Sequence, residues 1–253
     1  MNALFDYLAE ARTAHLRGDW RASYAAFVRA DGIGTMSTDD LDAYSVAAWR
    51  LGYRSEALRL AERTYDRLAR TDPTAAAMKA IVLALQWHAG EHDAVSRHWV
   101  DRARGLLAGV SAVGARGYLA YLEAAAALDA GDAPRAARAA AVLRDTASAT
   151  GDPTLVLLGR VVDGVTALME SRVAQGYRLL DDALVPVIDD RIALEWAGDL
   201  YRLVLRTGDW VDASHRRAWT VSMHRWVVNT GVVVDTGFAP CGACLSWPAT
   251  GCS

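Results

Sequence analysis

Apolar residues recur with the spacing of one helix face along about the first 225 residues of this 253-residue chain. The first such face comprises Leu4, Tyr7, Leu8, Ala11 and His15. A short turn follows each apolar stretch before the next one begins. Much of the apolar content is alanine, which favours helix, so the pattern predicts consecutive helices without strands.

Five of the turns carry a glycine: Gly18, Gly52, Gly90, Gly131 and Gly208. Their steps are 34, 38 and 41 residues, followed by one of 77 that has room for two repeats. We expect the missing turn near Glu170-Ser171. A period in this range is typical of stacked helix pairs, because one hairpin cannot bury its own apolar face. The prediction is an all-α, right-handed α-solenoid of about six antiparallel helix pairs over residues 1–227.

Capping and breaking residues set the expected limits of the pairs. Ser37 to Asp40 can accept the free N–H groups at the start of the second pair. Pro73 suits the first turn of the third pair, and Pro186 is expected to end the fifth. The predicted pairs span about 2–31, 38–70, 73–108, 112–150, 153–184 and 190–227.

Charge and hydropathy narrow the functional class. The net charge of −3 and the isoelectric point of about 6.1 argue against direct DNA binding by this chain. No apolar run approaches the ~20 residues of a membrane span, and the N-terminus lacks the features of a secretion signal. These features predict a cytoplasmic protein without membrane contact.

Residues 228–253 differ from the rest of the chain. They form an uncharged stretch apart from Asp235 and contain all three cysteines, so an irregular tail is expected. A shifted reading frame or a truncation near residue 228 would explain the abrupt change. Translating the other two frames of the gene tests this, because a frame shift requires one of them to restore the helical pattern.

The helix that precedes the tail carries an apolar stripe of Trp219, Met223, Trp226 and Val227. Solenoid ends need a polar outer face, so something must cover this stripe. The tail, a second copy of the chain in a homo-oligomer, or a further repeat could each do so.

The hairpins resemble tetratricopeptide repeats. In the first, Gly18-Asp19-Trp20 is followed by small Ser23, aromatic Phe27 and small Ala30, the order of contact residues in that family's second helix. Segments such as Leu51–Ala57 and Glu195–Tyr201 are similar to the repeat region of LuxR-type transcriptional regulators. This resemblance covers residues 1–227 and implies a role in transcriptional regulation.

In such regulators, the resemblance implies, a separate helix-turn-helix module reads DNA. No such module is found here, and the tail stands where further helices are expected. A nonfunctional fragment of a larger regulator is therefore an alternative interpretation of this chain.

Two motifs suggest metal or thiol chemistry. His88-Ala89-Gly90-Glu91-His92 matches the H-x-x-E-H pattern of one zinc peptidase class, but the repeat phase places Gly90 in a turn that separates the two histidines. Cys241 and Cys244 form a C-x-x-C pair with Cys252 nearby, without a fourth ligand. We expect neither a bound metal nor a cofactor.

Acidic residues gather at Asp189, Asp190, Glu195 and Asp199. Paired carboxylates can serve acid–base catalysis, but capping of a helix N-terminus and exposure to solvent explain these better. No nucleophilic side chain has a general base at the spacing of a known catalytic motif, so we expect no enzyme activity.

The first helix of each pair is expected to line a concave surface that holds a peptide, a partner protein or a small effector. The candidate residues facing this groove are Tyr44, Tyr118 and Tyr121. Most of the tryptophans are expected in the core, with Trp20 and Trp210 as wedges between the helices of a pair.

Overall fold

The computed structural model describes residues 3–89, 92–188, 194–207 and 210–230. Within these ranges the chain forms twelve helices and no strand, which confirms the all-α repeat architecture. The helices are α1 (Ala3–Leu16), α2 (Trp20–Asp31), α3 (Thr38–Arg50), α4 (Arg54–Thr71), α5 (Pro73–Ala89), α6 (Asp93–Leu107), α7 (Val113–Asp129), α8 (Ala133–Thr150), α9 (Pro153–Met169), α10 (Val173–Ile188), α11 (Leu194–Leu205) and α12 (Ala213–Thr230).

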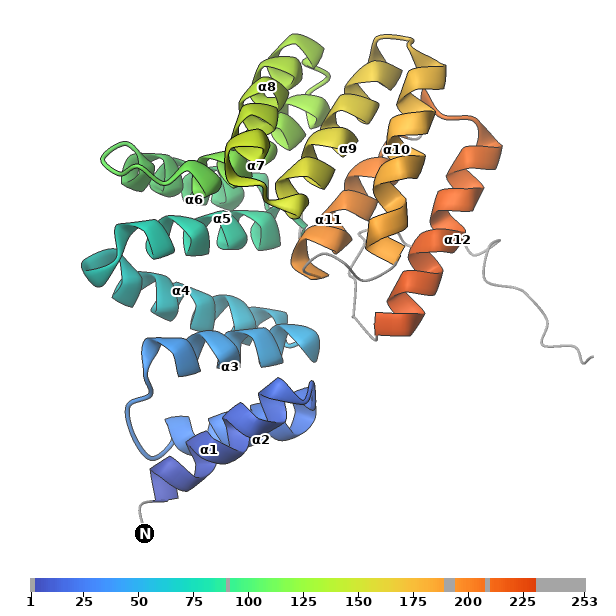
Figure 1. Ribbon diagram of the computed structural model, residues 1–253. Helices are drawn as coiled ribbons and strands as arrows, with labels where there is room; N and C mark the ends of the chain where they lie inside the picture. Colours follow the sequence, from blue (N-terminus) through green and yellow to red (C-terminus); the bar gives the residue numbers. More distant parts are fainter. Residues whose placement is uncertain (1–2, 90–91, 189–193, 208–209, 231–253) are drawn as a thin grey trace, which may run out of the picture.

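Consecutive helices pack as antiparallel pairs that stack along a curve (Figure 1). The pair limits agree with the sequence pattern to within a few residues, with one exception. Pro186 does not end the fifth pair, because α10 continues to Ile188. Val187, which follows this proline, is completely buried. The helix α12 also runs past residue 227 to Thr230.

The turns between paired helices share one backbone conformation. Gly18, Gly52 and Gly131 adopt positive φ angles of 71°, 79° and 72°. Ser171 adopts the same conformation, with a φ of 62°, at the turn where no glycine stands. It lies between α9 and α10, so the predicted degenerate repeat is confirmed. Gly90 and Gly208 lie outside the described residues.

The junction between the first two pairs is an ionic cap. Ser37 is the N-cap of α3 and its hydroxyl accepts a hydrogen bond from the backbone N–H of Asp40. The carboxylate of Asp40 is buried, and Arg12 of α1 donates to its two oxygens over 2.6 and 2.7 Å. This bidentate pair fixes α1 against the start of α3.

The first helices of successive pairs form one row on the inner side of the curve. Within this row α1 contacts α3, α5 contacts α7, and α7 contacts α9. The row does not simply continue to α11. Instead α11 lies against α5, α7 and α9 together, inside the bend of the stack (Figure 1). The sixth pair therefore contacts the third, fourth and fifth pairs, unlike a solenoid in which each repeat touches only its neighbours.

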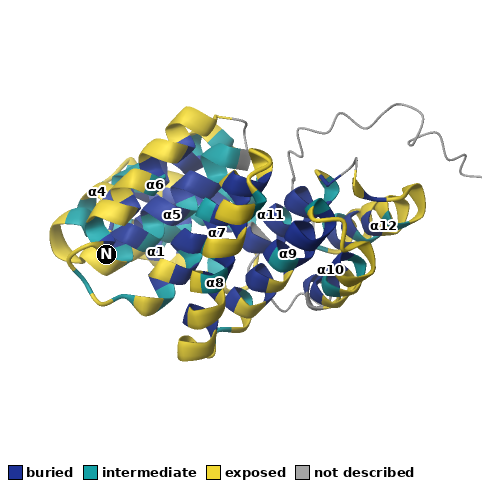
Figure 2. Ribbon diagram, turned by 90° about the horizontal axis from the view of Figure 1, so that it is seen from above, coloured by how far each residue is buried: buried dark blue, intermediate teal, exposed yellow. Residues whose placement is uncertain are grey.

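Burial follows this arrangement. Figure 2 shows buried residues along the interior of the stack and exposed residues at its outer edges. The apolar stripe of α12 is covered within the chain, because Trp219, Met223 and Trp226 are buried where α12 meets α10 and α11.

None of the helices described has the length and apolar character needed to cross a membrane.

The prediction that most tryptophans lie in the core is confirmed only in part. Trp99, Trp196, Trp219 and Trp226 are buried. Trp20 is half-buried between the ring of His15 and the guanidinium of Arg50, 4.7 Å from the Trp20 ring centre. Trp210 is 41% exposed, so its expected role as a buried wedge is wrong. Trp247 lies outside the described residues.

Candidate functional site

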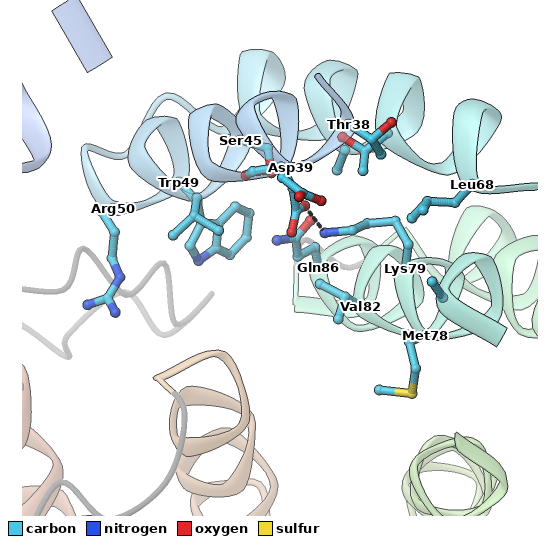
Figure 3. Close-up of a pocket in the computed structure, with 15 residues that line it drawn as sticks. Thr38, Asp39, Ser45, Trp49, Arg50, Leu68, Met78, Lys79, Val82 and Gln86 are labelled. Atoms are coloured by element: carbon cyan, nitrogen blue, oxygen red, sulfur yellow. Dashed lines mark hydrogen bonds and ion pairs between the residues drawn. The ribbon is translucent and has the colours of Figure 1, made fainter. Parts of the chain in front are cut away.

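The candidate binding site is a hollow of ≈ 600 Å³ between α3, α4 and α5, here called the α3–α5 trench (Figure 3). Its long walls are one face of α3 and one face of α5, the first helices of the second and third pairs. The helix α4 forms the floor between them. The trench therefore occupies the part of the inner row that α11 does not cover.

The trench has an apolar surface with charged groups on its walls. Apolar side chains come from all three helices: Val46, Trp49, Ala61, Leu68, Ala75, Met78 and Val82. The charged groups are Asp39, Asp42 and Arg50 on α3 and Lys79 on α5. A mainly apolar hollow with a few polar groups has the composition of ligand-binding pockets, whose volumes run from about 300 to 1,000 Å³.

An ion pair crosses the trench. Lys79, the only lysine of the chain, donates from its Nζ to Oδ1 of Asp42 on the opposite wall. The Lys79 side chain is 13% exposed, whereas that of Asp42 is 41% exposed. The pair therefore joins a nearly buried cation to a more exposed carboxylate, and a dashed line marks it in Figure 3.

Two further acceptors line the same hollow. The side-chain oxygen of Gln86 is buried without a hydrogen-bond donor in reach. Asp39 is exposed in the first turn of α3. The pKa of Arg12 is raised first by its hydrogen bond to Asp40, and the charge of Asp39 adds to the rise. Of these two acceptors, Asp39 on the α3 wall is open to N–H or O–H groups of a ligand.

Of the three tyrosines predicted to face a groove, Tyr44 does not. It is 2% exposed and packs with Phe27 in the core between α2 and α3. Its hydroxyl donates to Glu56 over 3.0 Å, and Tyr24 donates to the same carboxylate. Burial, followed by the hydrogen bond to Glu56, raises the pKa of Tyr44 far above its usual value and that of Tyr24 to about 12.

Tyr118 and Tyr121 lie on the inner row, but α11 covers the surface they face. The ring of Tyr118 lies 4.7 Å from that of Trp196, and Tyr118 also donates to Asp152 over 2.8 Å. Tyr121 is completely buried and donates to Asp199 over 2.5 Å. The prediction of an open groove at Tyr121 is therefore wrong, because the chain's own eleventh helix fills that place.

Asp199 was expected to be a solvated carboxylate, and the structure overturns this. It is 4% exposed and accepts a second hydrogen bond, over 2.8 Å, from Arg202. Burial, followed by the charge and hydrogen bond of Asp199, raises the pKa of Tyr121 well above its usual value. The pattern holds a signal for this, since Asp199 shares a helix face with Trp196 and Leu203.

A second ionic cluster holds the other end of α11. Asp129 of α7 lies 3.1 Å from Nε2 of His88 and 3.6 Å from Arg206. Burial raises the pKa of Asp129, but His88, Arg206 and Arg202 together outweigh burial, and the net pKa is lowered. His88 therefore joins α5 to α7.

The peptidase-like motif is divided between two elements. The helix α5, which carries His88, ends at Ala89, and His92 precedes α6. In the part of the chain with described coordinates, no cluster of three or more His, Cys, Asp or Glu side chains could hold a metal ion. Glu91, Asp189, Asp190, Cys241, Cys244 and Cys252 lie outside the described residues, and the side chain of Glu195 is not described.

Comparisons with known proteins identify no relative. No protein-family model, no curated protein and no solved structure matches this chain. The likeness to tetratricopeptide repeats and to LuxR-type regulators therefore rests on the residues quoted above. The assignment of the candidate binding site rests on its geometry.

Proposed function

We propose that this protein is a non-enzymatic helical-repeat scaffold that binds a peptide segment of a partner protein in the α3–α5 trench. One observation carries the proposal: the inner row of first helices is filled by α11 at α5, α7 and α9, and an amphipathic hollow remains at α3 and α5. The row is thus already used once to hold a helix. By its resemblance to regulators, the partner belongs to transcriptional control.

A small effector is the second candidate occupant. The ≈ 600 Å³ of the trench matches the volume of small-molecule sites, and its mixture of apolar surface and few charges suits such ligands. Either occupant would be held without covalent chemistry and without contact to DNA or membrane.

A variant that fills the trench tests the proposal. Val82 is half-buried on the α5 wall, so Val82→Arg places a bulky charge in the hollow. Val142→Arg is the matched control, because Val142 lies exposed on α8 outside the trench. Proteins captured by each variant from the native extract would be identified by mass spectrometry, with circular dichroism as a check of folding.

We expect a partner that the unchanged protein and Val142→Arg retain and Val82→Arg loses. Capture that is equal in all three would place the binding surface elsewhere. Loss of capture in both variants would point to a general effect of added charge and would also contradict the proposal.

A further inference from the structure

We propose that the α3–α5 trench recognises a helical segment that carries one acidic and one basic side chain about one turn apart, flanked by apolar residues. This inference rests on the proposed function and specifies the chemistry of the partner. Three features of the described residues support it: the ion pair across the trench, the helix already bound to the inner row, and the length of the trench.

The ion pair between Lys79 and Asp42 limits which ligands fit. A segment with only a basic group would take Asp42 and leave the nearly buried Lys79 ammonium without its partner. A segment with only an acidic group would take Lys79 and leave Asp42 unpaired. The loss of a partner is costly for Lys79, whose side chain is 13% exposed, and for Asp42, which is 41% exposed in the free chain, once a bound segment covers it. A segment with both charges replaces the one internal pair by two pairs across the interface, and neither wall is left unpaired.

The helix α11 shows that the inner row accepts such a segment. It carries Asp199 and Arg202 three residues apart, and their side chains pair while buried against the row. Apolar side chains flank the pair, among them Trp196 and Leu203. The same row of first helices continues into the trench, where Val46, Met78 and Val82 offer apolar surface beside the charges.

The dimensions agree with a helix of this size. The trench follows α3 from Asp39 to Arg50, which is about 16 Å at 1.5 Å per residue. The helix α11 has 12 residues and therefore about the same length.

Fluorescence anisotropy with labelled synthetic peptides tests the inference on the full chain. The first peptide has the sequence of residues 196–205, in which Asp199 and Arg202 are the only charged side chains, with blocked ends. The second carries Asp199→Asn, the third Arg202→Gln, and the fourth both changes. The protein variants are Asp42→Asn with Lys79→Met, which removes the trench pair, and Arg144→Gln with Asp163→Asn, which removes an exposed pair between α8 and α9.

With the unchanged protein, we expect the doubly charged peptide to bind at least ten times more tightly than either singly charged peptide, as the loss of a charged hydrogen bond implies. The neutral peptide should bind no more weakly than the singly charged ones, because it leaves the internal pair intact. This order should disappear in the trench variant and persist in the Arg144 and Asp163 variant.

Equal binding of all four peptides would overturn the inference and leave the proposed function standing. An order that persists in the trench variant would place the recognition elsewhere, and absence of binding by every peptide would also overturn the inference. The proposed function fails separately, when Val82→Arg retains the captured partner.

Discussion

The hydroxyl of Tyr121 donates a 2.5 Å hydrogen bond to the carboxylate of Asp199, 78 residues further along the chain. Both side chains are buried, and Arg202 donates to the other oxygen of the same carboxylate. This contact joins α7 to α11 across the inside of the bend. It helps to hold α11 over the surface that Tyr121 faces, and it directs attention to the trench between α3 and α5.

The Tyr121→Phe variant should be less stable because it removes this donor from a buried carboxylate. We expect the free energy of unfolding to fall by about 1.5 to 3 kcal/mol, the usual range for a hydrogen bond to a charged group. Urea denaturation followed by circular dichroism measures the change. Tyr53→Phe is the control, because Tyr53 is half exposed, and its change should stay within about 0.5 kcal/mol. Equal losses would contradict the role assigned to Tyr121.

Asp40 should make the stability of the fold sensitive to acid. The hydrogen bonds from Arg12 lower the pKa of this carboxyl despite its burial, and Ser37 adds to the effect. A carboxyl whose pKa is lower in the folded state stabilises the protein above its unfolded value of about 3.9, and this contribution is lost as the pH falls through the folded value.

Asp40→Asn removes the titrating group, so its stability should depend less on pH between about 5 and 2 than that of the unchanged protein. Melting temperatures over this interval provide the measurement. Asp145→Asn, an exposed change in α8, serves as the control and should follow the unchanged curve. A parallel curve for Asp40→Asn would show that the pair with Arg12 does not govern the acid response.

Two glycines inside helices should respond to alanine in opposite directions. A Cβ at Gly176 would lie 2.7 Å from Leu168, where α10 meets α9, so Gly176→Ala should lower the free energy of unfolding by about 1 to 3 kcal/mol. A Cβ at Gly105 in α6 would meet nothing within 4 Å. Gly105→Ala should therefore raise it by about 0.5 to 1 kcal/mol. Chemical denaturation of the two variants in parallel checks both signs, and a gain at Gly176 would refute the close packing of α9 and α10.

The positive φ of Ser171 should carry a cost that glycine removes. Left-handed backbone costs a residue with a side chain roughly 1 to 2 kcal/mol, and the greater freedom of an unfolded glycine cancels part of the gain. We expect Ser171→Gly to raise the melting temperature slightly and Gly131→Ala, at the equivalent turn, to lower it. Differential scanning calorimetry would detect both shifts, and a lower melting temperature for Ser171→Gly would mean that the serine side chain stabilises this turn by another route.

Local signals in the sequence were enough to predict the helix pairs. Asp72-Pro73 and Asp152-Pro153 mark helix starts for two reasons. The aspartate carboxylate accepts hydrogen bonds from free N–H groups of the first turn, and the proline has no N–H that would need an acceptor there. The period of the turns predicted the repeat and even the degenerate turn at Ser171, because each hairpin must pack on its neighbour. Pro186 was misleading as a helix end, because α10 continues to Ile188.

The location of the candidate site depended on contacts between distant helices, which produce no periodic pattern in the sequence. Tyr44, Tyr118 and Tyr121 all occur in first helices, yet one packs in the core and two lie beneath α11. A sequence pattern reports which residues share a helix face, but not which distant helix covers that face. The repeat units were therefore decided locally by capping and periodic burial. Tertiary packing decided the bend, the position of α11 on the inner row and the open trench. Asp199 and Tyr121, for example, are 78 residues apart in the chain and meet only in the folded protein.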